Sequence, residues 1–310
     1  MQTYCSETGL GLPLREKYYS LDDNDFKLLR FIESKQKNYG FVPLDIIENK
    51  SKINPSYLRN SIKKLLDLDL ILSESYPFYG YQLMYHGLDI LSLRYYFKRN
   101  IITDVGDRIN TGKESDIYLA ITSANNKAVI KFHREGRISF KSVVRKREYE
   151  IKQKKLWLLI AEKIAKREYD ILNGIWKNDG LVPEPIAHNR HSLIMNKIEG
   201  VELYKVKQID NKTLLNIFND IINTLKVAYN KVKIVHGDLN QYNVLISSEE
   251  NPRGYIIDWP QSIGVDSENA EYKLKKDVEY LASYLYKKFG TEIDIDKTLV
   301  YIKGGIDGFR

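Results

Sequence analysis

The sequence has little cysteine and no long apolar run. Its single cysteine, Cys5, excludes an intramolecular disulfide bond. No stretch approaches the ~20 consecutive apolar residues that a membrane-spanning helix needs. The first residues, Met1 to Cys5, lack the basic and then apolar pattern of a signal peptide. These absences predict a cytoplasmic protein without a membrane span.

Positive charge is in excess. The 310 residues include 48 Lys and Arg against 41 Asp and Glu, a formal net charge of +7. Such an excess favours an anionic partner, which could be nucleic acid, a phosphorylated ligand or an acidic surface, although a basic protein can also simply be soluble. The hydrophobic fraction of 43% is enough for a sizeable core, and the length allows two domains or one domain with an appendage.

Helical patterns dominate the first 70 residues, after a start over residues 1–20 that we expect to be irregular. Apolar residues at helical spacing follow Leu21. Pro43 suits the first turn of a second short helix, and Asn54 is an N-cap residue type with Pro55 after it, at the start of a third. On the side opposite its apolar stripe, the third helix has three basic residues: Arg59, Lys63 and Lys64.

Two short extended runs follow, at residues 70–74 and 81–84. Three helices and a hairpin are typical of a winged helix-turn-helix domain, whose third helix enters a nucleic-acid groove. The basic side of that helix is equally well an ordinary solvated face. The aromatic cluster from Tyr76 to Tyr81 could stack on bases or pack under the wing.

Residues 88–100 predict a linking helix, and a strand-rich region follows. A polar turn contains four residues that can surround phosphates: Gly112, Lys113, Glu114 and Ser115. Alone this signal is weak, because turns of this composition usually only connect strands. The segment from Arg134 to Tyr149 is rich in Arg and Lys and predicts a mobile basic loop. Its Arg137 and Lys141 are candidates for contact with RNA or phosphate, although such runs are usually solvated.

Alternation over residues 127–132 predicts a strand that directs Lys131 toward a partly apolar interior. A buried ammonium needs a carboxylate or an anionic ligand. Glu168 lies on the apolar face of a helix predicted around residues 157–175. In this order, Lys and Glu form the pair that positions the ATP phosphates in kinases. Taken singly, Lys131 could be an edge-strand charge and Glu168 a carboxylate that reaches water.

A connector at residues 196–200 follows a predicted strand, at the place where a kinase has its hinge. Backbone groups near Asn196 and Ile198 would recognise the adenine edge, with Met195 beside the ring. Met195 would also pack in the core in either case. A helical region is predicted from residue 206 to 232, and one further helix at residues 272–288.

The most informative stretch runs from His236 to Pro260. A polar loop leads into one short strand, and a second β-branched run ends at Asp258, so Asp238, Asn243 and Asp258 are predicted at the ends of neighbouring strands. In phosphoryl transfer one Asp deprotonates a hydroxyl, while an Asn and a second Asp bind Mg²⁺. The alternative is a surface turn in which Asp and Asn only cap and bend the chain.

Together these motifs resemble the RIO-type atypical serine/threonine protein kinases, type-2 subfamily, over nearly the whole chain. The matching segments are the winged helix, Gly112-Lys-Glu-Ser-Asp-Ile-Tyr118, Val129-Ile-Lys-Phe-His-Arg134, Gly136-Arg-Ile-Ser-Phe-Lys141, His236-Gly-Asp-Leu-Asn-Gln-Tyr-Asn243 and Ile257-Asp-Trp-Pro-Gln261. The short tail after the last predicted helix is similar to that of archaeal members.

The resemblance implies an α+β fold. It consists of a winged-helix domain at residues 1–90, a linker helix at 91–100 and a two-lobed, trimmed RIO kinase domain at 101–310. The latter has an N-lobe at 101–195, a hinge at 196–200 and a C-lobe at 201–310.

The resemblance also implies ATP and Mg²⁺, with Mn²⁺ able to substitute, and a role for each site residue. Asp238 would be the catalytic base, Asn243 and Asp258 the metal ligands, and Lys131, paired with Glu168, a phosphate contact with Ser115. Asp258 would also accept the phosphoryl group transiently. The expected partner is the pre-ribosomal small subunit with its rRNA, on which the protein would act as an ATPase and kinase in maturation.

Two other classes share parts of the pattern. Small-molecule phosphotransferases of the aminoglycoside or choline kinase type also use His-Gly-Asp-x-x-x-x-Asn and Ile-Asp-Trp. They lack an N-terminal winged helix and usually have a larger helical insertion after the hinge. A winged-helix nucleic-acid-binding regulator with a degenerate, ATP-sensing kinase domain is the other alternative, and it predicts that Asp238→Asn is harmless.

Overall fold

The computed structural model describes residues 12–76, 78–112, 114–134 and 147–304. The chain divides into two compact units, each described by itself below. The first comprises Met1–Lys163 with Asn189–Ser192, and the second comprises Ile164–His188 with Leu193–Arg310. None of the helices in the described ranges has both the length and the apolar character required to cross a membrane.

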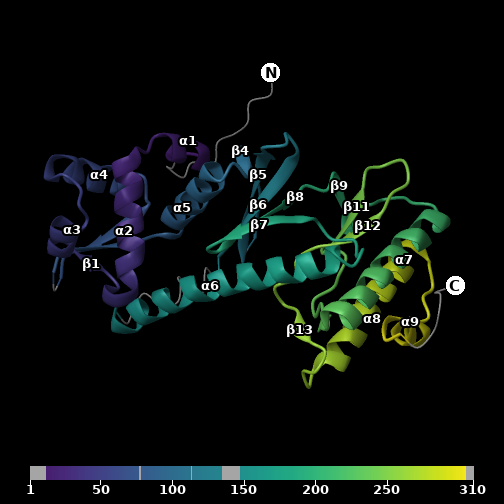
Figure 1. The fold of residues 1–310 in the computed structure, drawn as a ribbon. Helices are drawn as coiled ribbons and strands as arrows, with labels where there is room; N and C mark the ends of the chain where they lie inside the picture. The colour runs from purple at the N-terminus through teal and green to yellow at the C-terminus, as the bar shows by residue number, and fades with distance from the viewer. Residues whose placement is uncertain (1–11, 77, 113, 135–146, 305–310) are drawn as a thin grey trace. The chain divides into compact units, whose positions relative to one another are not determined.

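The first unit begins with the predicted winged helix-turn-helix arrangement (Figure 1). Its three-stranded sheet has the order β1-β3-β2, with β2 and β3 forming the antiparallel wing. The elements in chain order are α1 (Leu14–Tyr19), α2 (Asp23–Tyr39), β1 (Val42–Pro43), α3 (Leu44–Lys50), α4 (Pro55–Asp67), β2 (Ile71–Glu74), β3 (Gly80–Leu83) and α5 (Tyr85–Lys98).

Capping explains where these helices begin. Asp22 accepts from the backbone N–H of Asn24 and Asp25 in a capping box. Asn54 accepts from the N–H of Ser56 at 3.0 Å, and Pro55 occupies the first turn of α4. The N-cap predicted at Asn54 is therefore confirmed.

Two elements of this region were not predicted. The expectation that residues 1–20 are irregular is wrong, because Leu14–Tyr19 form α1. This short helix is stabilised by tertiary packing: the ring of Tyr18 stacks on Phe97 of α5 with centroids 4.6 Å apart. The two-residue strand β1 is set only by its pairing with β3, which local sequence does not encode.

Helix α5 begins at Tyr85, three residues before the predicted start, and is buried on most sides. It packs against α1, α2 and β3 of the winged helix and against β4 of the sheet that follows. That sheet is an antiparallel arrangement of β4 (Ile102–Thr111), β5 (Ser115–Thr122) and β6 (Lys127–His133). Asp89, which faces inward from α5, is fully buried.

The second unit contains the later strands and helices of the chain. Helix α6 (Arg147–Trp176) passes from the first unit into the second between Lys163 and Ile164. The remaining elements are β7 (Pro185–Asn189), β8 (Ser192–Asn196), β9 (Gly200–Glu202), η2 (Leu203–Lys205), α7 (Asn211–Val227), η3 (Ala228–Val232), β10 (Ile234–Val235), β11 (Val244–Ser247), β12 (Gly254–Ile256), β13 (Ile263–Gly264), α8 (Ala270–Phe289) and α9 (Ile295–Ile302).

Helix α7 packs on β12 of a small sheet with the order β12-β11-β9, and α9 contacts both α7 and α8. The prediction of a single helix after Asp258 is wrong, since α9 follows α8. Asp294 caps α9 by accepting from the N–H of Lys297, and its Ile302 is fully buried. An eight-residue helix of this kind depends on packing more than on its own periodicity.

Candidate active site

Strand pairing brings two predicted metal ligands together. In the register of β11 and β12, Val244 lies opposite Ile256. Asn243 directly precedes β11, and the N–H of Ile257 donates to the Asn243 carbonyl at 2.9 Å. Asp258 is the next residue after this bond. The predicted placement of Asn243 and Asp258 at adjoining strand ends is thus confirmed.

The loop before β11 closes on itself and connects Asp238 to Asn243. The amide Nδ2 of Asn243 donates to the Asp238 carbonyl at 2.9 Å, and the N–H of Asn243 donates to the Asn240 carbonyl at 3.0 Å. The side chain of Asn243 is nearly buried, whereas Asp238 is exposed. The loop therefore presents the Asp238 carboxylate to solvent while its backbone stays fixed.

His236 joins this loop to the segment that contains Asp258. Its Nε2–H donates to the Ile257 carbonyl at 3.1 Å, and its Nδ1 accepts from the N–H of Asp238 at 3.3 Å. One donating and one accepting nitrogen fit a neutral imidazole with its proton on Nε2. The ring also packs on Trp259, with centroids 4.6 Å apart, and both residues are fully buried.

Asp277 of α8 also fixes this loop, and its role was not predicted from the sequence. Its carboxylate accepts from the N–H of Gly237 at 2.7 Å and from the N–H of Leu239 at 2.9 Å. Burial raises the pKa of Asp277, and although these two hydrogen bonds lower it, the resulting pKa is about 6. The signal was an acidic residue on the buried stripe of a helix, which was used for Glu168 but not applied here.

Two residues of the site have left-handed backbone conformations. Gly237 has φ of 80°, and a Cβ there would lie 3.0 Å from the Gln261 carbonyl and 3.1 Å from Nζ of Lys273. The left-handed φ and the two close contacts both favour glycine at this position. Asp258 has φ of 66°, which is uncommon for a residue with a side chain, although Asp adopts it more often than most residues.

Helix α6 adds a buried carboxylate to the same region. Glu168 is 1% exposed, as its position on the apolar face predicted, and its Oε1 accepts from the N–H of Trp259 at 3.3 Å. Arg167 donates to the Ser262 carbonyl at 2.7 Å. The predicted pairing of Glu168 with Lys131 joins residues of different units and stays a prediction.

The candidate phosphate contacts lie in the first unit. The turn between β4 and β5 is closed by the Gly112 N–H, which donates to the Ser115 carbonyl at 2.8 Å. The carbonyl of Glu114 accepts from the N–H of Arg134 at 2.7 Å. Lys131 on β6 is 5% exposed, so its predicted burial is confirmed. Lys113 lies outside the described residues.

The predicted hinge follows β8 in the second unit. Met195 is buried, and the N–H of Asn196 donates to the Glu184 carbonyl at 2.9 Å. The side-chain amide of Asn196 also donates to the Glu184 carboxylate. These bonds orient Asn196 so that its N–H is already used, which leaves its carbonyl and the nearby Ile198 as candidate adenine contacts.

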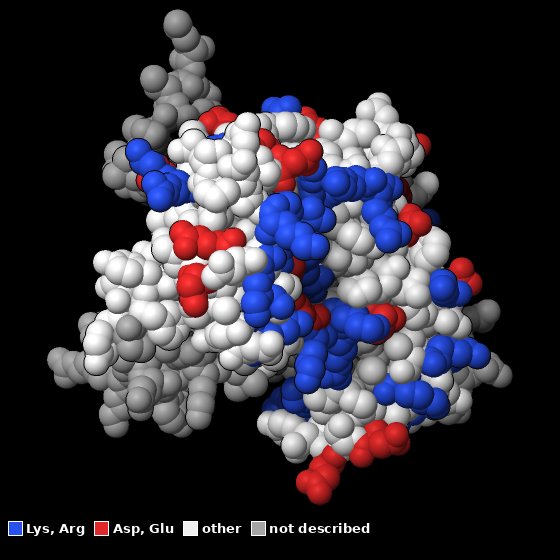
Figure 2. Space-filling model, turned by 60° about the vertical axis from the view of Figure 1, so that its left-hand side comes forward, with Lys and Arg blue, Asp and Glu red and all other residues white. Residues whose placement is uncertain are grey.

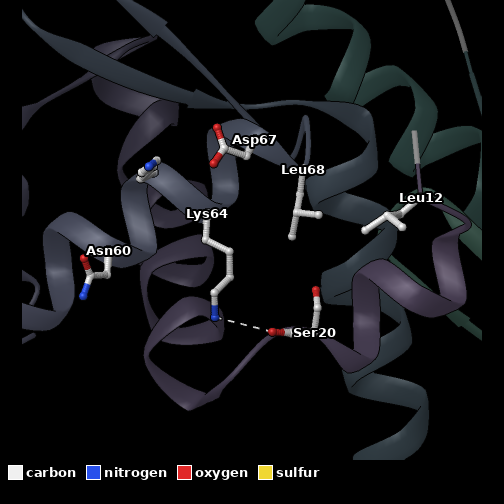
Figure 3. Close-up of a pocket in the computed structure, with 7 residues that line it drawn as sticks. Leu12, Ser20, Asn60, Lys64, Asp67 and Leu68 are labelled. Carbon is white, nitrogen blue, oxygen red and sulfur yellow. Dashed lines mark hydrogen bonds between the residues drawn. The ribbon is translucent and has the colours of Figure 1, made fainter. Parts of the chain in front are cut away.

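The basic residues of α4 differ in what they contact. Arg59 and Lys63 are exposed. Lys64 donates to Asp25 at 2.7 Å and to the Ser20 carbonyl at 3.4 Å, so part of its charge is neutralised within the protein. Figure 3 shows Lys64 directed toward Ser20 across a shallow pocket of about 330 Å³ beside α4. Lys and Arg side chains also gather on the face drawn in Figure 2.

For the flanking segments, the structure corrects one expectation and decides between two alternatives for two tyrosines. Arg134 was assigned to a mobile basic loop, but its side chain is 1% exposed and binds two buried carboxylates. Arg137 and Lys141 of that loop lie outside the described residues. At the wing, Tyr76 and Tyr79 are 83% and 66% exposed, so these two rings do not pack beneath it.

Metal binding at this site would need ligands from outside the protein. Within the residues that the structure describes, no group of three or more His, Cys, Asp and Glu could hold a metal ion. Mg²⁺, however, is usually bound by one or two protein oxygens, with water and substrate phosphates completing its octahedron. The carboxylate of Asp258 and the amide oxygen of Asn243 fit that donor set.

Three features are those of a protein-kinase-like phosphotransferase. They are a buried Lys on a strand, a predicted hinge segment, and an acidic loop between short strands. Family models agree: the RIO domain model matches residues 116–298, and the Rio2 N-terminal model matches residues 18–99. The chain belongs to the RIO family of serine/threonine-protein kinases and, within it, to the Rio2 group.

Several known proteins are similar over most of the chain. The RIO-type serine/threonine-protein kinase Rio2 of Methanocaldococcus jannaschii is 33% identical over 86% of this chain and 99% of its own length. The serine/threonine-protein kinase rio2 of Dictyostelium discoideum is 32% identical over 89% of this chain, which spans only 52% of that relative. A crystal structure of the Chaetomium thermophilum Rio2 kinase–ADP/Mg²⁺–phosphoaspartate complex has a TM-score of 0.79 and 27% identity, covering 94% of this chain and 89% of that one.

Proposed function

We propose that this chain is an ATP- and Mg²⁺-dependent atypical serine/threonine protein kinase with ATPase activity. One observation carries the proposal: strand pairing and the closed loop place Asp238, Asn243 and Asp258 together on a backbone fixed by His236. Preorganised acidic groups of this kind supply the metal ligands and the base that phosphoryl transfer requires.

On the nucleotide side, the turn from Gly112 to Ser115 would contact the phosphates, with Lys131 supplying positive charge. The Asn196 carbonyl and the N–H of Ile198 would bind the adenine edge, with Met195 against the ring. Glu168 would orient Lys131, as in the kinase Lys–Glu pair. The burial of Lys131 and Glu168 supports these roles, since each needs an ionic partner.

Asn243 and Asp258 would hold Mg²⁺ or, as a substitute, Mn²⁺, through their side-chain oxygens. When bound, the ion neutralises charge on the phosphates. Asp238 is the exposed acid of the loop and would accept the proton of a Ser or Thr hydroxyl as its oxygen attacks the γ-phosphorus. The bond from the γ-phosphorus to the bridging oxygen breaks, and ADP leaves.

Asp258 would also act as a transient phosphoryl acceptor. Its carboxylate oxygen attacks the γ-phosphorus, ADP leaves, and an aspartyl phosphate remains. A water molecule then attacks this phosphorus and gives its proton to Asp238, which restores the free carboxylate of Asp258. The phosphoaspartate complex of the Chaetomium thermophilum Rio2 kinase supports this step for the family.

We propose the pre-ribosomal small subunit and its rRNA as partners, and the cytoplasm as the location. This part rests on the resemblance to RIO kinases, and is supported by the net charge of +7 and by Arg59 and Lys63, which α4 exposes. Co-sedimentation with small-subunit precursors at increasing salt tests it. Association that weakens with salt is expected, and no association at low salt would contradict it.

The activity is tested by ATP turnover with Mg²⁺ in Asp238→Asn and Asp258→Asn. Each variant should lose about 10²–10⁴-fold in turnover, the range for removal of an acid–base group. Asp266→Asn changes an exposed aspartate of the same unit and serves as the matched control. Turnover equal to that of the control in both variants would refute the proposed chemistry.

A further inference from the structure

A buried guanidinium lies at the centre of the first unit. Arg134 donates through Nη2 and Nη1 to the two oxygens of Asp89, at 2.6 and 2.8 Å, and through Nε to Asp116 at 2.9 Å. His191 also binds Asp89, at 2.8 Å from Nε2. All four side chains are at most 1% exposed. We call these four residues the Arg134 cluster.

The chemistry of the Arg134 cluster makes its geometry rigid. Burial alone would raise the pKa of Asp89, but the charge of Arg134 and the hydrogen bond from His191 lower it to about 2. Burial lowers the pKa of His191, whose Nε2 lies 2.8 Å from Asp89 and 3.0 Å from Nη1 of Arg134. A bidentate guanidinium–carboxylate pair fixes both distance and plane, which a single point charge does not.

The Arg134 cluster joins four segments of the first unit. Asp89 belongs to α5, the helix packed on the winged helix, whereas Asp116 directly follows Ser115 on β5. The backbone of Arg134 binds the same turn, since its N–H donates to the Glu114 carbonyl at 2.7 Å. Both residues that flank Ser115 are thus bonded to Arg134.

We propose that Arg134 is a positioning residue that fixes the turn at Glu114 and Ser115 against helix α5, so that the turn can bind the β- and γ-phosphates of a nucleoside triphosphate. This inference rests on the proposed function of the turn. Arg134 itself is buried among carboxylates and touches no substrate. Its effect should therefore fall on the phosphates of the nucleotide and spare the nucleoside.

The test uses the full chain with two variants of the Arg134 cluster. Asp116→Ala removes the side-chain bond from Arg134 to β5, while Arg134 keeps its bidentate partner Asp89 and its backbone bond to Glu114. Arg134→Lys keeps the charge but cannot bridge both carboxylates. The matched control is Arg190→Met, because Arg190 forms another ion pair of the first unit, with Glu33, at 2.8 Å from Nη2, and does not contact the turn.

Calorimetry with Mg²⁺ measures the affinity for a non-hydrolysable ATP analogue and, separately, for adenosine. We expect both cluster variants to lose about tenfold or more in affinity for the analogue, because small displacements of phosphate-binding groups are costly. Their adenosine affinity should equal that of the unaltered chain. Arg190→Met should change neither affinity. Thermal unfolding confirms that each variant is folded at the assay temperature.

Two results would overturn the inference. The first is an unchanged affinity for the analogue in folded Asp116→Ala. The second is an equal loss for analogue and adenosine, which would show a merely structural role. Failure of the unaltered chain to bind the analogue would instead refute the proposed function.

Discussion

The acidic loop of the second unit and the phosphate turn of the first are fixed in different ways. Asp277 supports the acidic loop by accepting two backbone N–H groups, and the charge of Lys273 is the weakest of the influences on its pKa. The phosphate turn is bonded to Arg134, whose charge is balanced by two buried carboxylates. The acidic loop thus relies on one buried carboxylate, and the phosphate turn relies on an ionic network.

This difference predicts opposite responses to pH. The pKa of Asp277 is raised to about 6, since burial outweighs its hydrogen bonds, whereas the pKa of Asp89 is lowered to about 2 because Arg134 and His191 outweigh burial. Asp277 of the acidic loop therefore titrates near pH 6, whereas Asp89 of the Arg134 cluster titrates only in strong acid. Substitutions at the acidic loop should mainly lower ATP turnover, and substitutions at the phosphate turn should mainly lower affinity for the ATP analogue.

The largest expected effect follows from Asp277→Ala. The N–H groups of Gly237 and Leu239 lose their acceptor, so the loop that presents Asp238 shifts. Turnover of ATP should fall about 100-fold, as expected for displaced catalytic groups, with affinity for the ATP analogue retained. Asp116→Ala should show the reverse pattern. Equal losses of affinity for the ATP analogue in both variants would contradict this difference between the acidic loop and the phosphate turn.

The pH dependence of stability gives the next effect. Because its folded pKa exceeds 3.8, Asp277 contributes stability that is full below pH 3.8 and lost as pH rises through about 6. Asp277→Asn lacks this titration. Its free energy of unfolding should therefore rise relative to the unaltered chain by about 2 kcal/mol between pH 4 and pH 7. Urea denaturation across that range measures the difference, and a constant difference would contradict it.

Gly237 of the acidic loop and Gly112 of the phosphate turn differ in how strongly the backbone needs glycine. Gly237→Ala forces a side chain into φ of 80° and within 3.0 Å of the Gln261 carbonyl, so it should cost about 2 kcal/mol of stability. In Gly112→Ala the new Cβ would lie 3.4 Å from the Ser115 carbonyl, an ordinary contact. That variant should change stability by less than about 0.5 kcal/mol. Thermal unfolding of both variants decides whether only the acidic loop requires glycine.

The smallest effect concerns Asp89. Its folded pKa lies below 3.8, so its contribution to stability is present above pH 3.8 and is lost as pH falls toward 2. The stability of the unaltered chain relative to Asp89→Asn should fall by about 1 kcal/mol between pH 5 and pH 3. Urea denaturation at these two pH values measures it. If the stability of the unaltered chain relative to Asp89→Asn instead rose between pH 5 and pH 3, Arg134 would not lower the pKa of Asp89.

The sequence predicted more of the acidic loop than of the contacts that hold the phosphate turn. Asp238, Asn243 and Asp258 lie beside two β-branched runs that are close in sequence. This spacing predicted that the two strands pair and bring the three residues together. The same periodicity argument correctly predicted the burial of Glu168 and Lys131. These predictions succeeded because each depends on residues near one another in sequence.

The features missed depend on distant packing. Arg134 lies in a run of basic residues, and its two carboxylate partners are 45 and 18 residues away. Asp277 binds a loop 40 residues before it. Helix α1 and strand β1 likewise exist because of their tertiary contacts. Local pattern predicted that Glu168 and Lys131 are buried, but it does not show which distant groups a buried charge will bind.

In the proposed reaction, Asp258 accepts the phosphoryl group and Asp238 serves the proton transfer that removes it. Rapid quench of the full chain with γ-labelled ATP and Mg²⁺ tests this most directly, with hydroxylamine used to release acyl-bound phosphate. We predict hydroxylamine-sensitive label on the unaltered chain, more of it in Asp238→Asn because hydrolysis is slowed, and none in Asp258→Asn. Label of equal amount in Asp258→Asn would contradict the account.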